Sequence, residues 1–167
     1  MAYRIGGIEM EFQGLNLNCG LYCMNALMRR LHRNICPSSE AKRHARGKHI
    51  AYNAYALSEQ RHYGLAEVAQ PVDQASWEAL LRGNGPAIIA GDIGTVRMFG
   101  GLLGHFVLVV GVTDAGEIEY YDPLRPANML GGRLPRLAIP NLRRLTGAGN
   151  VLVCASAAAW TDVRGAG

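Results

Sequence analysis

Cys19 occupies a position at which a thiol would be reactive. Residues 19–33 are apolar on most faces, which predicts a buried helix, and Asn18 is a suitable N-cap for it. The thiol would then lie in the first turn, near unpaired backbone N–H groups and the positive end of the helix dipole. That environment lowers a thiol pKa from about 8.5 to roughly 3.5–7.5 and so produces the nucleophilic thiolate. Cys19 is therefore the candidate nucleophile, whereas we interpret Cys23, one turn deeper, as a core residue.

His105 and Asp122 stand at the two ends of one predicted hairpin. His105 begins a strongly apolar stretch, and Asp122 follows the return strand after a turn at residues 114–116. Antiparallel pairing brings the ends of a hairpin together, so the carboxylate is expected beside the imidazole. There it would hold the ring in one tautomer and stabilise the imidazolium. Taken singly, each residue also has an ordinary explanation, as a strand-end histidine or an Asp-Pro turn.

Four further residues would complete a site around this nucleophile and base. Gln13, six residues before Cys19, would direct its side-chain amide at a developing oxyanion together with the backbone N–H of Cys19. Gly101 and Gly104, in the glycine-rich loop before the candidate base, would let a substrate backbone approach closely. These glycines and Asn18 are the predicted substrate-binding residues.

The elements that must position these residues are helices first and strands afterwards. The predicted helices are residues 19–33, about 52–63, 74–82 and 140–145, and the predicted strands are 87–91, 105–113, 117–121 and 150–155. This order indicates an α+β fold and a single domain over residues 1–167. A helical part at about 13–82, with a buried central helix, would pack on an antiparallel sheet at about 86–155.

Composition excludes several classes of protein. Hydrophobic residues make up 49% of the 167 residues, which is typical of a globular domain, and no apolar run approaches the roughly 20 residues of a membrane span. No signal peptide is visible at the N-terminus, so we expect a cytoplasmic protein or one exported into a target cell by a signal-peptide-independent system. Four cysteines at irregular spacing predict neither a disulfide framework nor a zinc site, and no metal or cofactor is implied.

Basic residues crowd into segment 29–48 of a chain whose net charge is +4. The members are Arg29, Arg30, Arg33, Lys42, Arg43, Arg46 and Lys48. The segment is either a solvated helix end and loop or a docking patch for an acidic partner. No aromatic residues alternate with these charges, which argues against nucleic acid as the partner.

Two blocks of the sequence resemble a known superfamily. Residues 13–24, Gln-Gly-Leu-Asn-Leu-Asn-Cys-Gly-Leu-Tyr-Cys-Met, resemble the Gln-x5-Cys block of papain-like cysteine peptidases, and most closely the peptidase domain of bacteriocin-exporting ABC transporters. Within residues 85–123, Gly-Pro, Gly-His and Asp-Pro follow in the order found in papain-like effector proteases of pathogenic bacteria. The resemblance implies a papain-like fold with a peptide or protein substrate.

The resemblance also implies a role for each matching residue. Gln13 would stabilise the oxyanion, Cys19 would be the nucleophile, His105 the general base and acid, and Asp122 the orienting carboxylate. The chain departs from the exporter peptidases at Asn18, where they usually have Asp, and no Trp follows the nucleophile as it does in papain.

The predicted reaction is acyl transfer to the thiolate. A thiol protease cutting a peptide bond is the leading hypothesis, and a bacterial effector or toxin is the implied setting. A glutamine or asparagine deamidase would use the same triad. A non-catalytic papain-like module that binds a peptide, and a basic adaptor acting through segment 29–48, are the alternatives from other classes.

Overall fold

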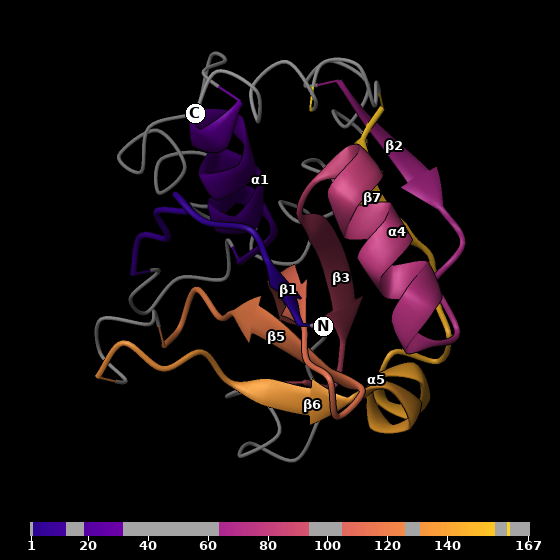
Figure 1. Cartoon of the computed structure of the whole chain (residues 1–167). Coiled ribbons are helices and arrows are strands. Elements are labelled where there is room, and N and C mark those ends of the chain that lie inside the picture. Colours follow the sequence, from indigo (N-terminus) through magenta and orange to yellow (C-terminus); the bar gives the residue numbers. More distant parts are fainter. Residues whose placement is uncertain are drawn as a thin grey trace.

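One antiparallel sheet organises the molecule (Figure 1). The computed structural model describes residues 2–12, 19–31, 64–93, 105–125, 131–155 and 160, and these residues form three helices and seven strands. The strands are β1 (Tyr3–Arg4), β2 (Leu65–Val68), β3 (Ala87–Gly91), β4 (His105–Val112), β5 (Glu117–Tyr121), β6 (Arg136–Ala138) and β7 (Val151–Cys154). The helices are α1 (Cys19–Arg30), α4 (Gln74–Asn84) and α5 (Ile139–Leu145). The fold is therefore α+β.

Strand β4 lies in the interior of the sheet, whose order is β2-β7-β3-β4-β5-β6 with β1 also paired to β4. All eight of its residues are buried, as expected for an almost continuous run of β-branched and other apolar side chains with a neighbour on each side. The register places Gly91 of β3 opposite His105, and Tyr121 of β5 opposite Leu108. The beginning of β4 and the end of β5 therefore lie at the same end of the hairpin that these two strands form.

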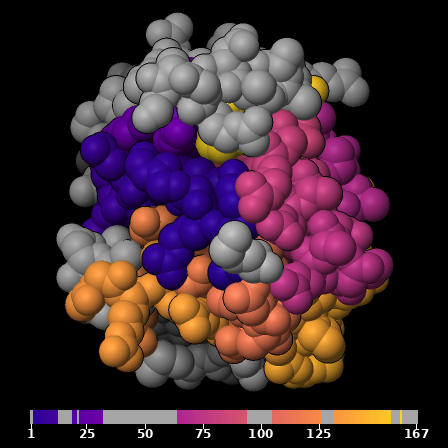
Figure 2. Space-filling model, in the orientation of Figure 1, coloured from indigo at the N-terminus to yellow at the C-terminus, as the bar shows by residue number. Residues whose placement is uncertain are grey.

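Helix α1 contacts β3 and β4, and α4 also contacts β4. The side chains of α1 that the structure describes are buried over most of its length, including Cys19, Met24 and Leu27. Because α1 is apolar on most faces, it packs tightly against the sheet. This packing also fixes the position of its first residue, Cys19. In the space-filling view, the N-terminal segments and the region of α4 lie side by side across the middle of the near face (Figure 2).

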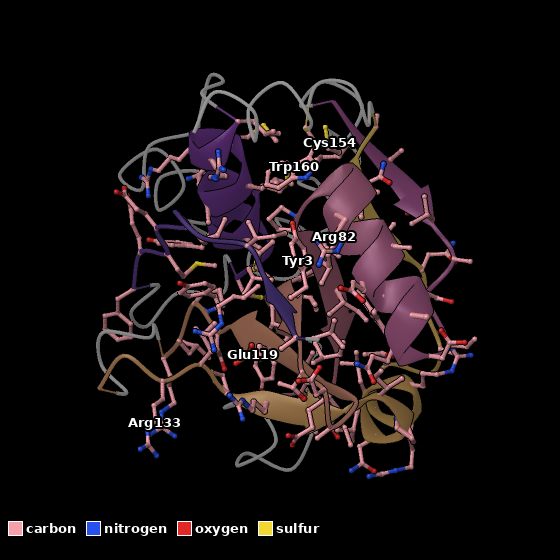
Figure 3. All side chains as sticks on the ribbon, viewed as in Figure 1. Tyr3, Arg82, Glu119, Arg133, Cys154 and Trp160 are labelled. Atoms are coloured by element: carbon pink, nitrogen blue, oxygen red, sulfur yellow. The ribbon has the colours of Figure 1, made fainter. Side chains whose placement is uncertain are left out.

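Two contacts between an arginine and an aromatic ring help to hold the N-terminal segments and α4 together. The Arg82 guanidinium of α4 lies 4.1 Å from the centroid of the Tyr3 ring of β1 (Figure 3). Trp160 is fully buried, packs against Gly85 at the C-cap of α4, and lies 5.3 Å below the guanidinium of Arg30. These contacts join parts of the chain that are far apart in sequence.

The predicted elements after residue 73 match the structure closely. The strand at 87–91 is confirmed. Strand β4 ends one residue before the end of the predicted strand at 105–113, and α4 ends two residues after the predicted helix at 74–82. Strands β1, β2 and β6 were not predicted, since they have two, four and three residues and show no alternating pattern. Strand β2 lies inside the range predicted to be helical, so that description of residues 13–82 was wrong in part. The predicted helix at 52–63 falls outside the described residues.

Among the helices in the described ranges, none has the length and apolar character needed to cross a membrane.

Candidate active site

Cys19 is the first residue of α1, as the capping pattern predicted. Its side chain is buried, with the residue only 3% exposed, and its Sγ accepts a hydrogen bond of 3.4 Å from the backbone N–H of Phe106. The helix places the sulfur near the backbone N–H groups of its first turn and the positive end of its dipole. Both surroundings direct N–H groups toward the sulfur.

His105 and Asp122 are in direct contact. The Nε2 atom of His105 lies 2.7 Å from Oδ1 of Asp122, and both residues are buried. The hairpin of β4 and β5 creates this contact, because His105 begins one strand and Asp122 follows the other. The same Oδ1 accepts the backbone N–H of Leu124 at 2.9 Å, which fixes the carboxylate in the turn after β5. The hairpin argument is therefore confirmed for the contact itself.

The imidazole of His105 also forms a hydrogen bond with the side chain of Cys19. Since Nε2 faces Asp122, the other ring nitrogen, Nδ1, is the one available to the sulfur. The structure thus places a thiol, an imidazole and a carboxylate in one connected line. This arrangement can generate a thiolate and can move a proton to or from a bound substrate.

The pKa of His105 is raised from 6.5 to about 9. Burial alone would lower it, because burial penalises the charged ring, but hydrogen bonds to Asp122 and Cys19 and the charges of both residues outweigh that effect. At neutral pH the ring is therefore an imidazolium. A positive charge beside Sγ is the condition under which a cysteine becomes a thiolate.

Cys23 lies one helical turn beyond Cys19 and has no exposed surface. Burial raises its thiol pKa well above the ordinary value, and the nearby charges of Cys19 and Asp122 raise it further. A thiol in that environment stays protonated and is a poor nucleophile. The interpretation of Cys23 as a core residue agrees with this burial. Cys19, Cys23 and Cys154 are all buried.

The remaining predicted site residues lie outside the described residues. Gln13, Asn18, Gly101 and Gly104 all fall there, and their roles stay predictions. The sequence reasoning missed two backbone donors, the N–H groups that bond Cys19 Sγ and Asp122 Oδ1. No residue type signals such donors. Within the described ranges, no group of three or more His, Cys, Asp or Glu side chains could hold a metal ion.

Two of the seven clustered basic residues are described, and both make contacts within the chain. Arg29 forms an ion pair with Glu11. Arg30 donates from Nε to the carbonyl of Gly6 at 3.2 Å and stacks over Trp160. These two arginines therefore help to hold α1 against neighbouring segments, and an acidic partner for segment 29–48 stays a prediction.

Solved structures provide the comparison with known proteins. A double glycine motif protease from an AMS/PCAT transporter, in complex with its leader peptide, has a TM-score of 0.54 at 19% identity, covering 92% of this chain and 96% of that one. A C39-like peptidase from Bacillus anthracis has a TM-score of 0.56 at 8% identity, covering 92% and 97%. The peptidase domain of Streptococcus ComA, a bifunctional ABC transporter, has a TM-score of 0.50 at 13% identity, covering 87% and 96%.

These neighbours are C39-like peptidases, and the chain shares their papain-like fold over most of its length. No protein-family model matches the sequence, and no curated protein matches it. The likeness is thus one of fold, and it agrees with the family that the sequence blocks resemble.

Proposed function

We propose that the chain is a papain-like cysteine protease in which Cys19, His105 and Asp122 form the catalytic triad. The observation that carries this proposal is the connected line of side chains, with His105 2.7 Å from Asp122 and hydrogen-bonded to Cys19. The fold shared with C39-like peptidases supports it. A module that only binds peptides would not require a buried thiol, imidazole and carboxylate in this order.

The reaction begins with the Cys19 thiolate, which attacks the carbonyl carbon of a peptide bond and forms a C–S bond. The His105 imidazolium then donates its Nδ1 proton to the departing amine as the C–N bond breaks. Asp122 keeps the ring oriented and balances its charge. Water next attacks the thioester, the imidazole takes its proton, and the thiolate is released. Gln13 and the backbone N–H of Cys19 would stabilise both oxyanions.

The substrate is a peptide in this proposal. The transporter protease that shares the fold was solved with a leader peptide, and its description names a double glycine motif. We therefore expect peptides that contain Gly-Gly to be the first useful substrates, with the same peptides carrying Ala-Ala as the matched comparison. Cleavage would give two fragments. A deamidase would instead leave the chain whole and add about one dalton to a Gln or Asn. The effector or toxin setting stays a prediction from sequence resemblance.

The first test measures whether Cys19 is a thiolate at mildly acidic pH. Iodoacetamide is added near pH 6, and mass spectrometry identifies which of the four cysteines is modified. We expect fast, selective modification of Cys19 and its loss in His105→Ala, because that variant removes the imidazolium. Uniformly slow modification of all four cysteines would disprove the triad.

A further inference from the structure

The backbone N–H of Phe106 points at the candidate nucleophile, with 3.4 Å between its nitrogen and Cys19 Sγ. Phe106 follows His105 at the beginning of β4, before the point at which β5 joins that strand. Pairing with β5 begins where Leu108 faces Tyr121, and the chain then turns away at the bridge between Asp122 and Arg125. Beside Phe106 there is therefore room for the N-terminal end of α1.

We propose that this N–H is a built-in donor that stabilises the Cys19 thiolate; the proposal rests on the proposed function, in which Cys19 is the nucleophile. An N–H group can only donate, and a negatively charged sulfur accepts more strongly than a neutral thiol. The bond is therefore stronger when the sulfur carries a negative charge than when it is a neutral thiol. Phe106 acts through its backbone, so it is a positioning residue whose ring is not required.

The arrangement gives β4 two functions within two consecutive residues. His105 supplies the imidazolium through its side chain, and Phe106 supplies a neutral donor through its backbone. Pairing of β3 with β4 holds both, since Ala90 faces Phe106 and Gly91 faces His105. A donor fixed by the sheet needs no rearrangement when the sulfur becomes charged. The N–H also remains in place above pH 9, where the imidazolium is lost.

The test removes one backbone N–H and keeps the side chain. Phenyllactic acid, introduced at position 106 by nonsense suppression, replaces the amide with an ester. We expect the midpoint of the pH dependence of Cys19 alkylation to rise by about one unit, since hydrogen bonds to charged groups are of that order. The matched control is the α-hydroxy analogue of leucine at Leu108, which removes an N–H from the same strand and should leave the midpoint unchanged.

The outcomes separate this inference from the proposed function. Slow alkylation of Cys19 in the unmodified protein would overturn the proposed function and this inference with it. Fast alkylation with the same midpoint in the Phe106 ester, or an equal shift in the Leu108 ester, would overturn this inference alone.

A second measurement needs no backbone change. The chain has three phenylalanines, so a protein labelled with 15N-phenylalanine gives three backbone amide signals. In Cys19→Ala, which lacks the sulfur acceptor, the Phe106 proton should move upfield more than the other two and should exchange faster with solvent. An unchanged Phe106 signal and exchange rate would also overturn the inference.

Discussion

Replacing Asp122 with Asn tests the electrostatic core of the proposed site. In the native protein the pKa of His105 is raised from 6.5 to about 9, although burial opposes the charged ring. At about 1.36 kcal/mol per unit, this shift corresponds to roughly 3 kcal/mol in favour of the imidazolium, an order-of-magnitude figure. In Asp122→Asn burial remains while the carboxylate charge is lost, so we expect the pKa of His105 to fall back toward its ordinary value. The thiol then loses its cationic partner at neutral pH.

The expected result is slower alkylation of Cys19 near pH 6, by about 10- to 100-fold, because a larger share of the sulfur is protonated. Above about pH 9 the two proteins should react at similar rates. The pH dependence of alkylation, with histidine NMR titration, measures both quantities. Asp114→Asn is the matched control, since it makes the same change at the exposed turn of the same hairpin. A folded Asp122→Asn protein that is alkylated at the native rate at pH 6 would refute the reasoning.

The same shift predicts how stability depends on pH. A group whose pKa is raised on folding binds its proton more tightly in the folded state, so its stabilising contribution is complete below about pH 6.5. The contribution is lost as pH rises through about 9. The difference in free energy of unfolding between native protein and Asp122→Asn should therefore shrink between those values. Urea denaturation at several pH values measures it, and a difference that grows with pH would contradict the assignment.

Two further predictions concern the contacts that hold the fold. Gly85→Ala should lower the free energy of unfolding by about 2–4 kcal/mol, since φ is 83° and the new Cβ would lie 2.6 Å from Trp160. The matched control is Gly83→Ala, where the added Cβ meets open space, and this variant should be neutral or stabilising. Equal thermal denaturation midpoints for the two variants would disprove this prediction. Glu119→Gln should destabilise the protein near neutral pH, and the effect should diminish as pH falls below 4.5: burial opposes the charge of Glu119, but hydrogen bonds and charges of two arginines lower its pKa, so its contribution is lost as pH falls through that lowered pKa. Urea denaturation should show a smaller effect for Glu67→Gln, which changes an exposed residue of β2, and an undiminished effect of Glu119→Gln at pH 3 would contradict the argument.

Much of the fold was predictable because its longest elements carry strong local patterns. The buried run from His105 to Val112 and the turn that follows predict a hairpin by themselves, and α4 has both a capping Asp73 and a terminating Gly85. Strand β2 was missed because, among the strands that the structure describes, its four residues pair with β7, whose residues lie far along the chain. Such a strand is determined by its partner, and its own sequence carries little signal.

In the candidate site, too, local contacts could be predicted from the sequence and long-range contacts could not. The contact between His105 and Asp122 follows from local geometry, since a hairpin brings its own ends together wherever it packs. The approach of Cys19 does not, because it requires α1 to dock against β3 and β4, more than fifty residues away in sequence. The Phe106 N–H was beyond prediction for another reason: every residue except proline has one, and only the register of β4 determines which N–H meets the sulfur. Side-chain chemistry could thus be inferred from residue types, whereas the backbone donors that tune it become visible only in the folded chain.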